Sequence, residues 1–222
     1  MKQVILSWSS GKDSAWTLYQ LQQKDDVEIV GLLTTINSEF KRVAMHAVRE
    51  ELLDAQAKAA GLPLFKVPLP WPCSNADYEK AIQSEFFRLK DEYGISHIAY
   101  GDLFLEDVRQ YRIDLMQGTG IEPLFPIWKT PTQQLAQEMI ANGVSAYLTC
   151  VDPKQLAGSY SGVKFDAHFI SSIADNIDPC GENGEFHTYV NAGPMFSDNI
   201  AINIGETVYR DGFFFTDLSL AN

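Results

Sequence analysis

Short apolar runs and longer segments of helical period alternate along the first half of the chain. An apolar run bounded by turn residues predicts a β-strand, and such runs cover Val4–Trp8, Ile29–Ile36, Leu64–Val67 and His97–Tyr100. Pro68 is expected to close the third of these strands. Apolar residues three or four positions apart predict helices over Ser14–Gln23, Val43–Ala60, Ser74–Gly94 and Glu106–Gln117. This alternation predicts an α/β fold, built from βαβ units around a parallel sheet.

The pattern changes where Pro123, Pro126 and Pro131 follow one another closely. Such a cluster breaks regular structure, and we expect a domain boundary there, with residues 1–125 in the first domain and 126–222 in the second. Beyond it the pattern predicts a helix, a strand, a short helix and, in the last forty residues, β-hairpins. The second domain is therefore predicted to be smaller and of the α+β class. The helix, strand and short helix are expected at Thr132–Asn142, Ala146–Val151 and Asp166–Ala174.

Composition narrows the function classes. The 222 residues include 17 Lys and Arg against 29 Asp and Glu, a net charge of −12, which argues against a protein that grips nucleic acid. The three cysteines, Cys73, Cys150 and Cys180, are too few and too far apart for a disulfide framework. No apolar stretch has the length of a membrane span or the form of a secretory signal. We expect a cytoplasmic protein without nucleic-acid or membrane partners.

The segment Ser7–Ser14, S-W-S-S-G-K-D-S, lies between the first predicted strand and the first predicted helix. Backbone N–H groups and hydroxyls at a helix N-terminus form a site for a phosphate chain. Gly11 permits a tight turn, Lys12 supplies a positive charge, and Asp13 is expected either to cap the helix or to bind Mg²⁺. A Walker A loop is excluded, because Leu6 stands where its first glycine belongs and Asp13 follows the lysine. The residues expected at the phosphates are Ser7, Trp8, Ser9, Ser10, Gly11, Lys12, Asp13 and Ser14.

A second segment, Cys180–Thr188, reads C-G-E-N-G-E-F-H-T. It places two carboxylates three residues apart among two glycines, which is unlike a core strand. Loops of this composition bring backbone N–H groups and carboxylates close to a substrate. Cys180 is expected to be a small buried residue, since no base that would activate it as a nucleophile is evident in the sequence.

The first segment resembles the phosphate loop of the PP-loop ATP pyrophosphatases, which cleave ATP to AMP and pyrophosphate and have a Rossmann-like (HUP-type) sheet. Ser10 departs from their usual Ser-Gly-Gly-x-Asp-Ser at the first glycine. The second segment is similar to the G-E-x-G-E-aromatic signature of the diphthine ammonia ligase family. Further segments match that family in order, so the resemblance covers nearly the whole chain. They are Arg42–His46 with Gln56, Gly101-Asp102 followed by Arg109 and Arg112, Pro126-x-Trp128, Gly193–Phe196 and Arg210–Phe213.

The resemblance implies an ATP- and Mg²⁺-dependent ligase that adenylates a carboxylate and then amidates it with ammonia. It assigns Lys12 to the departing pyrophosphate, Asp13 to catalysis and to the metal, and Glu182 or Glu185 to accepting a proton, with the choice between the two glutamates left open. The residues that it assigns to the acceptor substrate are His46, Gly101, Asp102, Arg109, Arg112, Gly181 and Gly184.

Several alternatives stay open at this point. The acceptor is expected to be a small-molecule or protein-borne carboxylate. His187-Thr188 and Asn183 resemble the bacterial group of the family, for which a cobalamin-precursor carboxylate is an alternative to diphthine. An ATP-binding sensor without catalysis is a second alternative, and a sulfur- or tRNA-modifying enzyme is disfavoured by the cysteine spacing and the net charge. Apolar residues near Trp71 and at Phe213–Phe215 belong either to a homo-oligomer interface or to the core.

Overall fold

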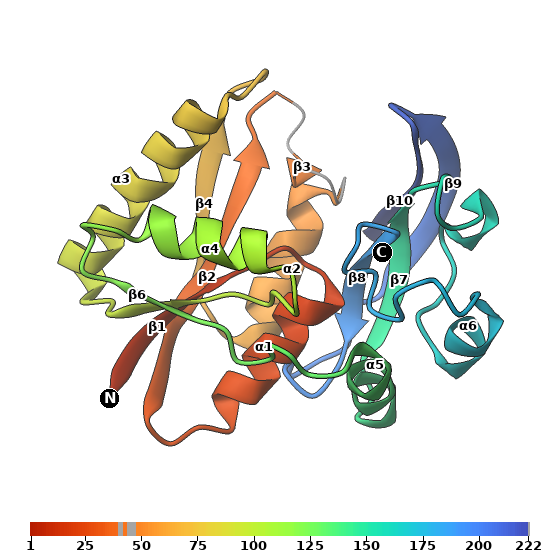
Figure 1. Cartoon of the computed structure of the whole chain (residues 1–222), viewed down its shortest axis with the longest axis horizontal. Coiled ribbons are helices and arrows are strands. Elements are labelled where there is room, and N and C mark those ends of the chain that lie inside the picture. Colours follow the sequence, from red (N-terminus) through yellow and green to blue (C-terminus); the bar gives the residue numbers. More distant parts are fainter. Residues whose placement is uncertain (40–41, 44–47, 222) are drawn as a thin grey trace.

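The computed structural model describes residues 1–39, 42–43 and 48–221. It contains two β-sheets that stand side by side, with α1 (Lys12–Gln22) between them (Figure 1). The first sheet comes from the N-terminal half of the chain and the second from the C-terminal half. The predicted α/β class is confirmed.

The first sheet has five parallel strands in the order β4-β2-β1-β5-β6. A short sixth strand, β3, pairs antiparallel with the end of β2. The carboxyl ends of β1 and β5 lie next to each other, which is where open α/β sheets place their ligands. The strands are β1 (Lys2–Ser7), β2 (Val27–Asn37), β3 (Arg42–Val43), β4 (Leu64–Leu69), β5 (His97–Ala99) and β6 (Glu122–Leu124).

Helices cover both faces of this sheet, because successive apolar side chains of β1 point to opposite faces and each must be buried. Val4 and Leu6 belong to the buried cluster that includes α1 and α2 (Glu50–Ala60). Ile5 points to the opposite face, where it joins the cluster formed with α3 (Asn75–Tyr93) and α4 (Glu106–Leu115). The sheet is therefore doubly wound, as the resemblance implied.

Besides small shifts at the ends of several elements, three features of the first half differ from the predictions. The helix expected from Val43 begins at Glu50, and residues 42–43 instead pair antiparallel with the end of β2. β4 continues through Pro68 to Leu69, with Pro68 placed opposite Ile36. β6 was not predicted, because the run of prolines hid a strand at the sheet edge, where proline is tolerated.

The second sheet is antiparallel, in the order β8-β7-β10-β9. Of the hairpins expected in the last forty residues, the described residues contain one, formed by β9 and β10 with a turn at residues 211–212, whereas β8 pairs with β7. The elements of this half are α5 (Thr132–Ala141), β7 (Ser145–Val151), a single 3₁₀ turn (Gly158–Tyr160), α6 (Ala167–Ser172), β8 (Phe186–Ala192), β9 (Ile202–Arg210) and β10 (Phe213–Leu220).

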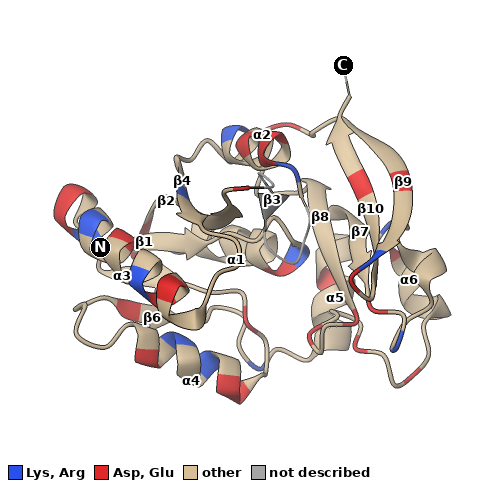
Figure 2. Cartoon of the chain, turned by 90° about the horizontal axis from the view of Figure 1, so that it is seen from above, with Lys and Arg blue, Asp and Glu red and all other residues tan. Residues whose placement is uncertain are grey.

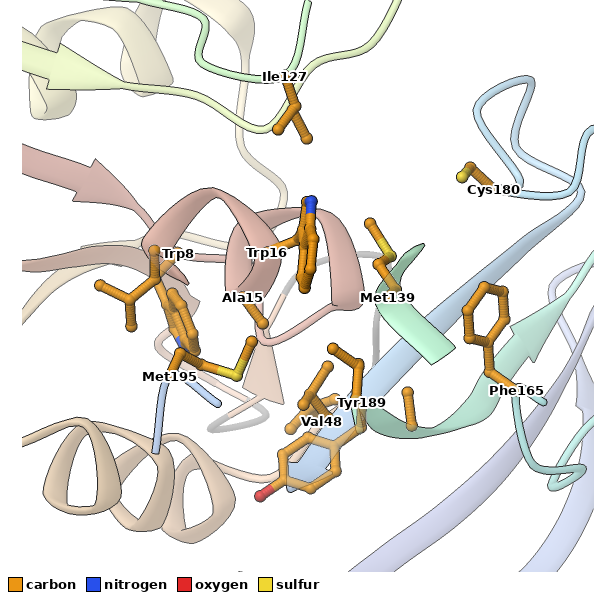
Figure 3. Close-up of a cluster of buried hydrophobic side chains, with 14 of the residues drawn as sticks. Trp8, Ala15, Trp16, Val48, Ile127, Met139, Phe165, Cys180, Tyr189 and Met195 are labelled. Atoms are coloured by element: carbon orange, nitrogen blue, oxygen red, sulfur yellow. The ribbon is translucent and has the colours of Figure 1, made fainter. Parts of the chain in front are cut away.

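One hydrophobic cluster runs through both halves. Figure 3 shows Trp8 and Trp16 from the first half together with Met139, Phe165 and Tyr189 from the second. The boundary after residue 125 stays a prediction, because the core is continuous across it. Within the described residues, no helix is both long and apolar enough to span a membrane.

Candidate active site

A cavity of about 290 Å³ opens at the carboxyl ends of β1 and β5, and the glycine-rich loop of residues 180–188 forms its other wall. Segments far apart in the sequence therefore meet in one place. The lining residues are Ser7, Ser9, Gly11, Lys12, Asp13, Ser14, Tyr100, Gly101, Asp102, Arg112, Cys180, Gly181, Glu182, Gly184, Phe186, His187 and Thr188.

The loop after β1 begins α1 with Gly11 as its N-cap, in an extended conformation. The alternative role of Asp13 as the cap is therefore wrong, since the side chain of Asp13 pairs with Lys12 instead. The Ser14 hydroxyl donates to the Gly11 carbonyl at 3.0 Å and lies 3.2 Å from the Ser9 hydroxyl. Two hydroxyls and the first turn of a helix thus face the same cavity, as a phosphate site needs.

Ser10 has a φ of 72°, in the left-handed region that favours glycine. Its side chain is buried, and its hydroxyl has no hydrogen-bond partner among the described residues. The Ser10 carbonyl instead accepts hydrogen bonds from the Val190 N–H at 3.1 Å and from Gln56 Nε2 at 3.0 Å. Ser10 therefore shapes the loop through its backbone, and its side chain does not line the cavity.

Gln56 is fully buried and connects three parts of the molecule. Its carbonyl oxygen accepts from the Trp8 indole N–H at 2.9 Å, and its amide donates to the carbonyls of Ser10 and Val190. The signal for this role was present in the sequence as a polar residue among the apolar positions of α2, but residue pattern alone does not identify its partners.

Lys12 is only 2 % exposed, although its side chain contributes to the cavity wall. Its ammonium donates to the Asp13 carboxylate at 2.9 Å and to the Cys180 carbonyl, and it lies 5.4 Å from the centre of the Phe186 ring. Burial lowers the pKa of Lys12, but Asp13 together with Cys180 and Glu182 outweighs burial and leaves the pKa raised. Lys12 is therefore a charged group at the interior end of the cavity.

Glu182 faces the cavity. Its carboxylate accepts a hydrogen bond from the Leu103 N–H at 2.8 Å, in the loop that follows β5. Burial raises the pKa of Glu182 to about 7, so the group can bind or release a proton near neutral pH.

Glu185 has a different environment. It is 1 % exposed and is not among the cavity-lining residues of the described chain. Its carboxylate accepts from the N–H groups of Asp178 and Asn183, each at 3.0 Å, and from the Asn183 amide at 3.1 Å. Two glutamates that look equivalent in the sequence therefore differ, because one faces the cavity and the other holds the loop together.

Backbone geometry explains the glycines of this loop. Gly181 and Gly184 have φ values of 70° and 83°, and a Cβ on Gly181 would lie 2.8 Å from the Phe186 carbonyl. Asp178, which the sequence did not single out, accepts from the N–H groups of Cys180 and Glu182 at 2.8 and 3.3 Å. Cys180 is buried, as expected, and burial raises the pKa of its thiol.

The loop after β5 supplies the third wall. A Cβ on Gly101 would lie 2.9 Å from the backbone of Asp13, so only glycine lets the two loops approach this closely. Asp102 lies 3.5 Å from the guanidinium of Arg112, which stacks over the Tyr100 ring at 4.8 Å. Burial raises the pKa of Asp102.

Arg109 and Arg112 lie in different surroundings. Arg112 lines the cavity, whereas Arg109 stacks over Phe125 and Trp128 at 5.1 and 5.2 Å and lines none of the cavities described here. Of the two arginines expected at the acceptor substrate, Arg112 is therefore the one that lines the cavity.

A second cavity, of about 250 Å³, adjoins the first; we name it the apolar cavity after its apolar wall, and polar residues line the rest of it. Leu33, Ile82 and Phe86 line it, and so does Trp8 from the phosphate loop. His187 lies on the boundary between the two cavities, and burial lowers its pKa to about 4, so its imidazole is neutral near pH 7. The residues common to both cavities are Ser7, Ser9, Tyr100, Arg112 and His187.

The structure thus brings most of the expected site residues together. His46 lies outside the described residues, and the sequence did not single out Tyr100, His187 and Gln56 as site residues. Asp13 and Asp102 both line the cavity, from the start of α1 and from the loop after β5, and no group of three or more His, Cys, Asp or Glu residues in the described ranges forms a metal site by itself.

Comparison with known proteins gives consistent matches over the chain. The family described as diphthamide synthase N-terminal domain matches residues 1–121, and the diphthamide synthase C-terminal domain matches residues 131–219. Diphthine–ammonia ligase of Danio rerio is 24 % identical over 222 residues, which cover 90 % of this chain and 86 % of that protein. The human enzyme of the same name is 23 % identical over 235 residues, covering 95 % and 86 %.

Proposed function

The chain belongs to the diphthamide synthase family, and from this premise we propose that it is an ATP-dependent ligase that adenylates a carboxylate and amidates it with ammonia. The observation that carries the proposal is the meeting of a polar and an apolar cavity at one phosphate loop, with the titratable Glu182 on the facing wall. Because the relatives are named diphthine–ammonia ligases, diphthine is the first acceptor to test.

The two cavities fit the two ends of ATP. The apolar cavity, with Leu33, Ile82 and Phe86, suits the adenosine, and the first turn of α1 with Ser9 and Ser14 suits the phosphates. Bound ATP supplies the α-phosphorus that the acceptor carboxylate attacks, with pyrophosphate as the leaving group. Arg112, on the boundary of both cavities, is placed to orient that carboxylate through its fork of N–H donors.

Asp13 and Asp102 are the residues proposed to hold Mg²⁺. Magnesium in nucleotide sites commonly takes one or two carboxylates together with phosphate oxygens and water, so two carboxylates that line one cavity fit it. A bound Mg²⁺ would supply charge neutralisation to the phosphates.

Lys12 and Glu182 have separate roles in this proposal. The ammonium of Lys12 stabilises negative charge that develops at the inner end of the cavity. Glu182 accepts the proton that the attacking nitrogen loses when the new C–N bond forms and AMP leaves, which suits a carboxylate with a pKa of about 7. All three cysteines are free thiols, in keeping with the cytoplasmic location that we propose.

The test measures AMP and pyrophosphate release from ATP, Mg²⁺ and ammonium, with diphthine-bearing elongation factor and a panel of small carboxylates as acceptors. We expect acceptor-dependent AMP formation that is lost in Lys12→Ala and Glu182→Gln. Formation of ADP would contradict the adenylation step. Nucleotide binding without turnover on any acceptor would favour the alternative of an ATP-binding sensor without catalysis.

A further inference from the structure

Strand β8 of the second sheet reaches the phosphate loop of the first half. Figure 2 shows β8 beside α1, as Figure 1 does. The two meet at the first residue of the helix, where the Lys12 N–H donates to Thr188 Oγ1 at 3.1 Å. N–H groups at this end of a helix have no partner within the helix. β8 has no charged residue, so whatever it contributes at the phosphates comes from a neutral group.

The Thr188 hydroxyl has a proton left to donate. The side chain is 2 % exposed and lines the first cavity. A hydroxyl has one proton and two lone pairs, and one lone pair accepts the Lys12 N–H. Within the part of the chain that the structure describes, no group accepts the Thr188 proton. Because a buried donor without an acceptor is costly, the cavity favours a ligand that brings an acceptor oxygen.

The two serine hydroxyls of the phosphate loop differ from Thr188 in this respect. The Ser14 hydroxyl already donates to the Gly11 carbonyl at 3.0 Å. The Ser9 hydroxyl lies 3.2 Å from Ser14 Oγ, so both serines have partners inside the loop. Of these three hydroxyls, the one that comes from the second half is therefore the one with its proton available to a ligand.

The two cavities indicate which part of the nucleotide Thr188 meets. Thr188 lines the first cavity and is absent from the wall of the apolar cavity. A nucleotide with its adenosine in the apolar cavity crosses the boundary between the cavities, where Arg112 and His187 lie, with its α-phosphate. The β- and γ-phosphates extend beyond that boundary, into the part of the first cavity that Thr188 lines.

We propose that Thr188 is a phosphate ligand supplied by the second half of the chain, and that its hydroxyl donates to an oxygen of the β- or γ-phosphate while it accepts the Lys12 N–H. This proposal rests on the proposed function, since it assigns a further residue to the same ATP site. Bound ATP then connects the two halves. Thr188 ends the glycine-rich loop that carries Glu182, so the same contact fixes that carboxylate relative to the nucleotide.

The experiment measures dissociation constants of the non-cleavable α,β-methylene-ATP and of AMP, by calorimetry on the full chain with Mg²⁺. Thr188→Val and Thr188→Ala both remove the hydroxyl, and each should weaken binding of α,β-methylene-ATP about tenfold or more, the usual effect of losing a hydrogen bond to a charged group. Binding of AMP, which has only the α-phosphate, should stay unchanged. Thr188→Ser keeps the hydroxyl and should bind both nucleotides as the wild type does.

Thr149→Val is the matched control. Thr149 is equally buried, lies on the neighbouring strand β7 and donates to the His187 carbonyl at 3.4 Å, but it is not among the cavity-lining residues of the described chain. The variant should therefore bind both nucleotides as the wild type does. Thermal unfolding of every variant shows which of them are folded.

Three results would overturn the proposal. Unchanged binding of α,β-methylene-ATP in folded Thr188→Val and Thr188→Ala would show that the hydroxyl does not contact the phosphates. Tighter binding would show that it competes with them for the Lys12 N–H. Equal losses for AMP and α,β-methylene-ATP would assign Thr188 a structural role. If the wild type itself binds neither nucleotide, the proposed function fails, which is distinct from these three results.

Discussion

The carboxylate of Glu182 accepts a hydrogen bond of 2.8 Å from the backbone N–H of Leu103. This bond joins the glycine-rich loop of the second half to the loop that follows β5 in the first. It also fixes one carboxylate oxygen and so orients the group along the cavity wall. Glu182 thereby combines a defined position with a pKa of about 7.

The first prediction concerns the pH dependence of activity. A base is active when deprotonated, so the rate should rise as the pH passes through about 7 and then level off. Glu182→Gln should lower kcat about 100-fold and remove this rise. Rates are compared at constant free ammonia, because the ammonium ion also titrates. A variant that keeps the wild-type pH profile would show that another group is the base.

The same group makes a separate prediction for stability. The pKa of Glu182 is raised from 4.5 to about 7 in the folded chain, so its contribution to stability is complete below pH 4.5 and is lost as the pH rises through 7. The difference in stability between Glu182→Gln and the wild type should therefore shift in favour of the variant as the pH is raised from 5 to 8. Thermal unfolding of both proteins at the two pH values measures this difference, and a gap that does not change with pH would contradict it.

Glu185→Gln should affect stability and KM rather than kcat. The substitution replaces an acceptor oxygen with an amide group that faces N–H donors, and it should cost about 2 kcal/mol of unfolding free energy. Activity should fall mainly through a higher KM, since the loop loses its shape while Glu182 keeps its chemistry. Urea unfolding combined with steady-state kinetics separates these effects. A normal unfolding curve with a lost kcat would instead assign the base role to Glu185.

Arg112 and Arg109 form a matched pair on one helix. Arg112→Lys keeps the charge but loses the planar fork, and kcat/KM for the acceptor should fall by about tenfold or more. Arg109→Leu removes only the stacking on Phe125 and Trp128 and should cost about 1 kcal/mol of stability with kcat/KM unchanged. Equal kinetic losses in the two variants would show that both arginines contact substrate.

Ser10→Gly should raise the unfolding free energy by about 1 kcal/mol. The left-handed conformation costs serine about 1–2 kcal/mol, and its buried hydroxyl without a partner adds to that cost. The greater freedom of glycine in the unfolded chain offsets about 0.5–1 kcal/mol of the gain. Thermal unfolding measures the difference, with Ser9→Gly as a control, because Ser9 has no positive φ. A lower melting temperature in Ser10→Gly would indicate that the hydroxyl has an interaction of its own.

The sequence predicted the sheet, its helices and the two loops of the site, because the spacing of apolar residues and the residue types of a loop can be read from a short stretch of chain. The start of a helix at Ser74 and the end of a helix at Ala60 were predicted for the same reason, and both are confirmed: Ser74 is the N-cap of α3, and α2 ends at Ala60. β6 was not predicted, since it depends on pairing with β5, and the start of α2 was misplaced because Val43 pairs with Ile36 of β2.

Within the site, the residue types that carry the chemistry were easier to predict than the direction in which each side chain points. Glu182 and Glu185 lie in the same motif, and only the fold shows that the first faces the cavity and the second faces the loop backbone. Arg109 and Arg112 differ in the same way, because aromatic residues from a distant segment, Phe125 and Trp128, hold one of them. The role of Gln56 was missed because its three partners lie far from it along the chain, the most distant by 134 positions.

The phosphate loop also has a consequence for how this protein can change over evolutionary time. The Val190 N–H holds the Ser10 carbonyl, and Thr188 accepts the N–H of Lys12, so the nucleotide end depends on a strand encoded far downstream. A recombinant that joins the first half of one relative to the second half of another would break this fit unless both contacts were preserved. The two halves must therefore be inherited as a pair, and substitutions around Ser10, Gln56 and Val190 are expected to compensate for one another.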